Sequence, residues 1–186
     1  MAVPRAQETI DKAAEERARF ADWVRSVPDE QWSRTSPEGI WQARDYVAHL
    51  ASIDPLLTGW FRSVQDPAQK HSFTRGFSID EWNEERILAR RNNSIDDVLA
   101  ELESNRAELN AALADFTDEQ LDSTIHFGGD AKRAPRDIPL HLYLRGWVYH
   151  DRWHMEDARR AIAGEAEQPF GDEAFARAAR EQRRDA

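Results

Sequence analysis

Residues 40–64 read IWQARDYVAHLASIDPLLTGWFRSV and have the pattern of a deeply buried helix. Large apolar residues recur through this stretch at the spacing of a helix face that packs on a core. Pro55 lies inside the pattern and is expected to bend or loosen the helix near Ala51, because proline has no amide hydrogen and its ring collides with the carbonyl four residues earlier. The stretch therefore predicts a long helix with one local irregularity. Its apolar residues are Trp41, Val47, Ala48, Leu50, Ile53, Leu56, Leu57, Trp60 and Phe61.

Three other stretches have a similar amphipathic periodicity and predict further long helices. One covers residues 6–27 and ends at Pro28, one follows the N-cap residue Ser94, and one covers residues 138–163 and stops at Gly164. No stretch sustains the apolar and polar alternation of a β-strand. The sequence therefore predicts an all-α fold, and specifically a four-helix bundle.

The connections between the long helices also have recognisable patterns. Ser78 and Glu81 have the spacing of a capping box, which predicts a short extra helix between the second and third long helices, ending near Arg90. Residues 65–77 and residues 125–135 contain glycine and proline, and both segments are predicted to be loops.

Length and composition limit the class of protein. A chain of 186 residues fits one domain; we expect residues 1–165 to form it and residues 166–186 to be a charged tail or short helix. The absence of cysteine excludes disulfides, thiolate zinc sites, iron–sulfur clusters and cysteine nucleophiles.

The charge and hydropathy of the chain limit which partners and which cellular location are expected. A net charge of −10 opposes binding to nucleic-acid phosphates, and no apolar run approaches the ~18 residues of a membrane span. The first residues lack the basic and apolar regions of a secretory signal. We therefore expect a cytoplasmic protein that binds neither nucleic acid nor membrane.

Three histidines are the candidate metal ligands. His150 and His154 are four residues apart, so both imidazoles project from one face of a helix. His49 lies among apolar residues of the second helix, where an unpaired imidazole would cost about 1–3 kcal/mol. In a four-helix bundle the second and fourth helices can face each other across the core, which is where such folds place metal sites. The alternative is that these histidines are ordinary core residues, since the four-residue spacing also occurs by chance.

The residues near these histidines have less specific signals. Asp45 precedes His49 by one turn, and it either accepts from an imidazole N–H or favours the positive end of the helix dipole. Asp157 follows His154 by three residues and is either a similar acceptor or a solvated carboxylate. The expected pocket residues, which lie near the histidines along the predicted helices, are Trp41, Trp147, Trp153 and Arg145.

The other histidines are predicted not to bind metal. His141 precedes His150 by nine residues, about half a revolution on an ideal helix, so it should point away from the site. His71 and His126 lie in the predicted loops, where an exposed position is expected.

Two segments resemble the DinB and YfiT-like superfamily, which includes the mycothiol-dependent maleylpyruvate isomerases. They are residues 40–50, which read IWQARDYVAHL, and residues 150–154, which read HDRWH. Residues 82–84, which read WNE and precede the third long helix, also look similar to the family. The resemblance covers roughly residues 6–163 and implies a four-helix bundle in which His49, His150 and His154 bind zinc, nickel or a similar divalent ion. It also implies a homodimer and an activity among thiol-dependent transferases and isomerases or metal-dependent hydrolases.

The predicted function is that of a metal-dependent enzyme acting on a small molecule, most directly by transfer involving a low-molecular-weight thiol. Three neutral imidazoles leave the double charge of the ion in place, so it can lower the pKa of a bound thiol or water. One alternative is a hydrolase that uses metal-bound hydroxide, with Asp45 or Asp157 as the candidate base. Another is a non-enzymatic, stress-associated dimer in which the ion only joins two helices.

Overall fold

The computed structural model describes residues 2–37, 39–66, 78–127 and 134–166. Four long helical segments form a bundle, which confirms the predicted all-α fold class. They are α1 (Pro4–Ser26), α2 (Ala43–Gln65), α4 (Ile95–Ala114) and a C-terminal segment made of α6 (Leu140–Trp147) and α7 (His150–Ala163). The predicted short helix between the second and third long helices is α3 (Ile79–Arg90), which begins at the N-cap Ser78.

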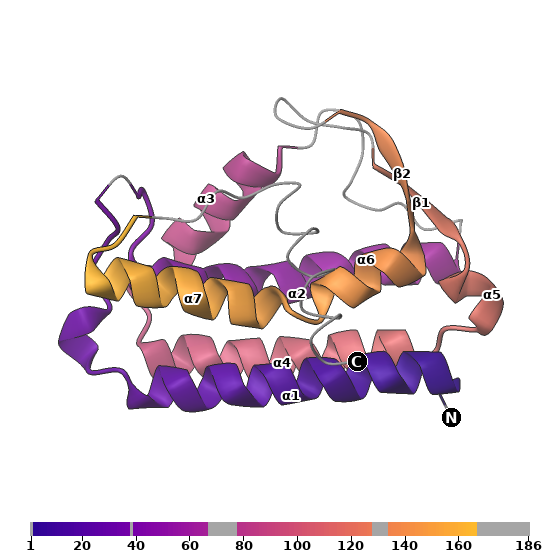
Figure 1. Cartoon of the computed structure of the whole chain (residues 1–186), viewed down its shortest axis with the longest axis horizontal. Coiled ribbons are helices and arrows are strands. Elements are labelled where there is room, and N and C mark those ends of the chain that lie inside the picture. Colours follow the sequence, from indigo (N-terminus) through magenta and orange to yellow (C-terminus); the bar gives the residue numbers. More distant parts are fainter. Residues whose placement is uncertain (1, 38, 67–77, 128–133, 167–186) are drawn as a thin grey trace.

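The helices are arranged in two layers. Figure 1 shows α2 beside α7 and α6 in one layer and α1 beside α4 in the other, with α3 on the outer side of the α2 and α7 layer. Helices α1 and α7 run in one direction, and α2 and α4 run in the opposite one. Helix α2 packs against both α4 and α7. None of the described helices is both long and apolar enough to cross a membrane.

The core lies between the two layers. Its largest fully buried side chains come from every long helix, and the apolar face predicted for α2 is buried almost completely. This packing, rather than helix propensity alone, stabilises the bundle. The largest fully buried side chains are Phe20, Phe61, Phe116, Leu50, Leu57, Ile87, Leu102, Leu109, Leu113, Leu121, Leu140 and Leu144.

Helix α2 continues through Pro55 because another helix replaces the lost hydrogen bond. Pro55 cannot donate to the carbonyl of Ala51, and the side-chain amide of Asn105 on α4 donates to that oxygen at 2.8 Å. The irregularity predicted near Ala51 is therefore absorbed by a side chain from a neighbouring helix. Nothing in the local sequence assigns this role to Asn105.

The loop predicted over residues 125–135 is only partly a loop. Strands β1 (Thr124–Phe127) and β2 (Arg136–Pro139) pair antiparallel, with Ile125 opposite Ile138, and a short helix, α5 (Asp118–Leu121), precedes them. Each strand has only four residues, so its alternation is too short to register as a strand pattern. Residues 128–133 between the strands lie outside the described part of the chain.

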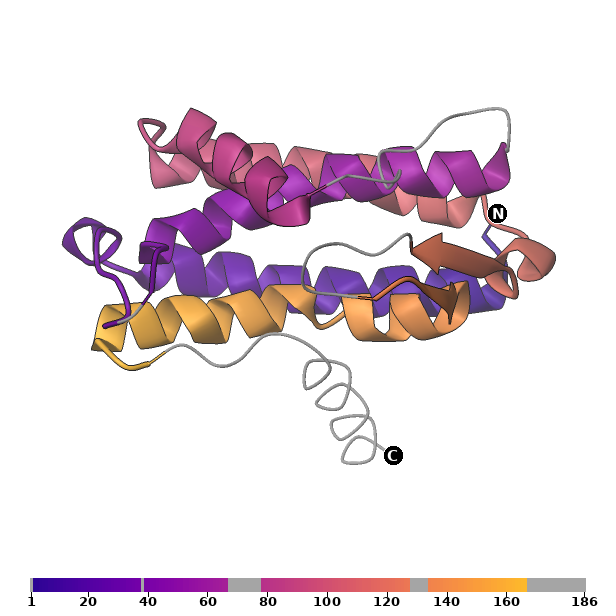
Figure 2. The same cartoon turned by 90° about the horizontal axis from the view of Figure 1, so that it is seen from above.

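The single helix predicted over residues 138–163 is wrong. The helix is interrupted at Val148 and Tyr149, where the amide of Tyr149 donates to the carbonyl of Gly146 rather than to Arg145. Seen from above, α6 and α7 follow one another along one edge of the bundle with this break between them (Figure 2). The interruption contains no proline, so the periodicity continues across it and does not reveal it.

Candidate metal centre

The three predicted ligands meet between α2 and α7. His49 comes from α2, whereas His150 and His154 occupy the first two turns of α7. One ligand nitrogen from each lies within 4.8 Å of those of the other two, and no other such group of potential ligands is found in the described residues. His49 is 5 % exposed and His154 is 2 % exposed, while His150 is partly exposed. The cluster is therefore largely buried, and His150 is its most exposed member.

The spacing of two ring nitrogens fits a shared ion. The Nε2 atoms of His150 and His154 lie 3.0 Å apart. An ion at about 2.0–2.1 Å from each nitrogen would separate them by roughly 2.9–3.4 Å, depending on whether the angle is square or tetrahedral. A single proton shared between the rings would produce a similar distance, so this spacing shows that the rings are arranged to hold either a proton or an ion.

The orientation of His49 is set from α3. Its Nδ1 atom lies 3.1 Å from Oδ1 of the buried Asn83. Because an amide oxygen only accepts, Nδ1 carries the hydrogen and Nε2 keeps its lone pair. Such a partner fixes both the tautomer and the rotation of a metal-binding imidazole. Asn83 was assigned no role from the sequence, since it lies 34 residues from His49 along the chain.

Asp157 is beside the centre, whereas Asp45 caps a helix. Oδ2 of Asp157 lies 3.5 Å from Nδ1 of His154, on the side of the ring away from the Nε2 that approaches His150. Oδ2 of Asp45 accepts from the backbone amide of Gln42 at 2.9 Å, as part of a capping box, and from Arg91 at 3.1 Å. Asp45 thus lies at the start of a helix, as in its helix-dipole alternative. Asp157 is buried beside the His154 ring, but its carboxylate makes no hydrogen bond to Nδ1.

Aromatic rings cover part of the cluster. The ring centroid of Trp41 lies 5.3 Å from that of His49 and 6.4 Å from that of His154. Tyr46 packs on Trp41 at 5.2 Å and lies 5.9 Å from His154. Tyr46 was not singled out from the sequence, although its position three residues before His49 places both on one helix face.

The other predicted pocket residues have different surroundings. The indole of Trp147 packs under the guanidinium of Arg106, 4.8 Å from the ring centroid. Trp153 is buried in the core, and Arg145 is exposed on α6. Of the four predicted pocket residues, Trp41 is therefore the one with recorded ring contacts to the histidines.

The environment favours uncharged imidazoles. Burial lowers the pKa of His49 well below its ordinary value, and His154 lowers it further, against a smaller opposing effect of the hydrogen bond to Asn83. The pKa of His150 is also lowered well below its ordinary value, by burial and by neighbouring imidazole and guanidinium groups. Neutral imidazoles have the free lone pairs that a metal ion needs. The donor set, its convergence and its tautomer therefore fit a divalent ion.

The remaining histidines are outside this cluster. His126 is exposed on β1, and its Nδ1 lies 2.8 Å from Oδ1 of Asp137 on β2. His141 lies on α6, and it is not a member of the group of converging ligands. His71 lies outside the described residues.

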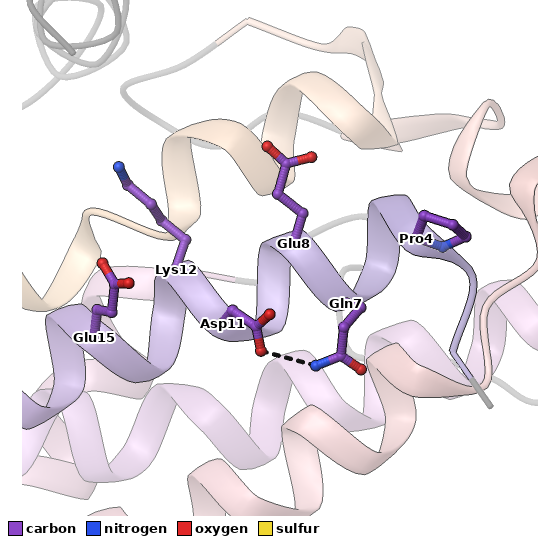
Figure 3. A pocket seen from close by; sticks show the side chains of 6 residues that line it. All are labelled: Pro4, Gln7, Glu8, Asp11, Lys12 and Glu15. Carbon is purple, nitrogen blue, oxygen red and sulfur yellow. Dashed lines mark hydrogen bonds between the residues drawn. The ribbon is translucent and has the colours of Figure 1, made fainter.

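A shallow surface hollow of about 460 Å³ lies along the outer face of α1 and contains none of the candidate ligands. Figure 3 shows its side chains arrayed along the helix, with Gln7 donating to Asp11. The hollow is mainly a solvated acidic surface and has no visible relation to the histidine cluster. Its lining residues are Pro4, Gln7, Glu8, Asp11, Lys12 and Glu15.

Comparison with known families and structures agrees with the fold. The family model described as the DinB superfamily matches residues 13–158. A search of curated proteins found no match.

Solved structures with the same fold include two of one enzyme and one bacterial protein. The crystal structure of the mycothiol-dependent maleylpyruvate isomerase is 17 % identical, with a TM-score of 0.65 over 95 % of this chain and 68 % of that one. A histidine-to-alanine mutant of that enzyme is 16 % identical, with the same TM-score and coverage. YfiT from Bacillus subtilis, described as a probable metal-dependent hydrolase with an unusual four-helix bundle topology, is 19 % identical, with a TM-score of 0.64 over 88 % of this chain and 89 % of that one.

Proposed function

We propose that this chain, which belongs to the DinB superfamily, is a metal-dependent enzyme that acts on a small molecule. The observation that carries the proposal is the convergence of His49, His150 and His154 from two facing helices. Imidazole ligands suit zinc and nickel among the divalent ions, and we propose one of these as the resident metal. Three protein ligands leave at least one coordination position for a substrate or water, as in catalytic rather than structural sites.

The protein side chains have separate tasks in this proposal. His49, His150 and His154 would hold the ion, Asn83 orients His49, and a divalent ion bound there would supply the charge that lowers the pKa of a thiol or water. Trp41 and Tyr46 form an apolar wall that keeps bulk water from one side of the cluster. The partly exposed side of His150 is the side from which a small molecule would enter.

We favour transfer involving a low-molecular-weight thiol as the reaction. Support comes from the similarity in fold to a mycothiol-dependent isomerase and from the three-histidine ligand set, which leaves the full charge of the ion to stabilise a thiolate. The second candidate is a hydrolase, in line with the described function of YfiT. The position of Asp157 behind the ring of His154 suits orientation of that ligand better than proton transfer to a substrate.

The two reactions can be separated by activity assays on one preparation. Zinc- or nickel-loaded protein would be incubated with thiols plus small electrophiles and, in parallel, with ester and amide substrates. We expect thiol conjugation by the loaded protein and none by the apoprotein or by a His49→Ala variant. Hydrolysis that depends on the metal and not on thiol would instead support the hydrolase. The homodimer and the cytoplasmic location stay predictions from the sequence.

A further inference from the structure

A closed cluster of four buried charges joins the four long helices. It contributes one residue from each of α1, α2, α4 and α7, with two positive and two negative charges that balance. Each member is at most 5 % exposed. We call it the four-helix ionic cluster, and its residues are Arg17, Asp54, Arg106 and Asp151.

Each carboxylate in the cluster is held by both guanidinium groups. Asp151 accepts from Nε and Nη2 of Arg17 at 2.7 and 3.0 Å and from Nη2 of Arg106 at 3.2 Å. Asp54 accepts from Nε and Nη2 of Arg106 at 2.9 and 3.2 Å and from Nη2 of Arg17 at 3.1 Å. Burial alone would raise the pKa of Asp151, but Arg106 and Arg17 outweigh it and lower the pKa to about 2. The cluster therefore stays charged.

Stability alone is a weak explanation for these four charges. Removing ions from water is costly, and replacing a buried ionic cluster by well-packed apolar side chains often leaves a protein equally or more stable. What such a cluster provides is a defined geometry, because fork-shaped guanidinium groups accept carboxylates only in a few orientations.

The cluster lies directly beside the candidate metal ligands in the sequence and in the fold. Asp151 follows His150 in the first turn of α7, and Asp54 lies on α2, the helix that carries His49. Arg106 also covers the ring of Trp147, the last residue of α6, so it contacts both sides of the break between α6 and α7. Helices α2 and α7, which supply all three histidines, are thus both held by the ion pairs of the four-helix ionic cluster.

We propose that the four-helix ionic cluster positions the metal ligands by fixing the rotation of the first turn of α7 relative to α2. This inference rests on the proposed function, since it assigns the cluster a role at the same metal centre. Its members are positioning residues, because none of them belongs to the group of converging ligands. Without the cluster, α7 can rotate after the break. The Nε2 atoms of His150 and His154, which lie 3.0 Å apart, then no longer point toward His49.

A second buried ion pair offers a matched control. Glu16 on α1 is 2 % exposed and pairs with Arg152 on α7, so it joins the same two helices as Arg17 and Asp151. Glu16 is held by Arg19 on α1 and by Arg152 on α7. A Glu16→Gln variant should therefore lower stability without weakening metal binding, whereas loss of the cluster should affect the metal centre itself.

The experiment compares zinc affinity and the visible spectrum of the cobalt-substituted protein across four untagged proteins. They are the parent, Asp151→Asn, Glu16→Gln and an apolar replacement of the whole cluster (Arg17→Met, Asp54→Leu, Arg106→Met, Asp151→Leu). We expect Asp151→Asn and the apolar replacement, while helical by circular dichroism, to bind zinc at least about tenfold more weakly and to change the cobalt bands. Glu16→Gln should match the parent in both readouts.

The outcomes separate this inference from the proposed function. A parent that binds no zinc contradicts the proposed function. Parent and apolar replacement with equal zinc affinity and equal cobalt spectra overturn the positioning role while the metal centre stands.

If neither variant folds, hydrogen exchange in the native protein tests the positioning role instead. Zinc should slow hydrogen exchange at the Nε–H groups of Arg17 and Arg106 and leave that of Arg152 unchanged, because binding and cluster geometry are linked. Unchanged exchange at Arg17 and Arg106 would overturn the proposal.

Discussion

Nδ1 of His49 lies 3.1 Å from Oδ1 of Asn83, so a residue of the short helix α3 determines which nitrogen of a core histidine on α2 is free to bind an ion. Through this contact, α3 contributes a residue to the site as well as packing on the outside of the bundle. It also makes the role of α3 testable without altering any of the three histidines.

Asn83→Ala should weaken zinc binding by about 10–100-fold, because His49 loses the acceptor that fixes its tautomer and rotation. Isothermal titration of the apoprotein measures this affinity directly. Asn105→Ala is the matched control, since Asn105 is also a helix-borne amide with one buried partner, Ala51, and that partner is not at the site. An Asn83→Ala protein that binds zinc as tightly as the Asn105→Ala protein would exclude an orienting role.

Asn105→Ala should itself lower the free energy of unfolding by about 1–2 kcal/mol, because the carbonyl of Ala51 is then left without a partner. In a Pro55→Ala background, the new amide at position 55 can donate to that carbonyl, so the same substitution should cost less. Urea unfolding of the four proteins in this double-mutant cycle measures the difference. Equal costs in the two backgrounds would show that Asn105 does not compensate for Pro55.

Trp41 should report an ion in the cluster. Its ring centroid lies 5.3 Å from that of His49, and bound Ni²⁺ or Cu²⁺ quenches indole fluorescence at such short range. Titration with Ni²⁺ should therefore quench the parent, which has seven tryptophans, more strongly than a Trp41→Phe variant with the same nickel affinity. Equal quenching in the two proteins would place the ion away from Trp41.

Removal of the metal should leave the bundle folded. The core is continuous through all four long helices and does not depend on the histidines. We expect the chelated protein to keep its helical circular dichroism, and zinc at about 100 times its dissociation constant to stabilise it by about 2.7 kcal/mol. Unfolding on chelation would instead favour the alternative in which the ion only joins the two helices.

The parts of the site that are local in sequence were predictable from sequence. His150 and His154 are ligand candidates because a four-residue spacing fixes their relative direction on any helix. His49 is the third candidate because it lies among apolar residues of a helix, where burying an imidazole is costly unless it has a partner. The convergence of the three across two helices is confirmed by the geometry of the cluster.

The parts that depend on contacts between helices were not predictable. The break at Val148 and Tyr149 lies where Arg106 holds both Trp147 and Asp151, a contact between residues far apart in sequence. The acceptor role of Asn83 also depends on a contact between helices, since its partner His49 lies 34 residues away along the chain. Periodicity reports which face of a helix is buried, and it contains no information about which residue on another helix will meet it.

If the three histidines bind one divalent ion, the purified protein should contain that metal in a fixed ratio to the chain. Inductively coupled plasma mass spectrometry would be applied to the untagged parent and to a His150→Ala, His154→Ala double variant prepared in the same way. We expect about one zinc or nickel ion per chain in the parent and almost none in the variant. Equally low metal in both proteins, even after zinc or nickel is added back, would contradict this expectation.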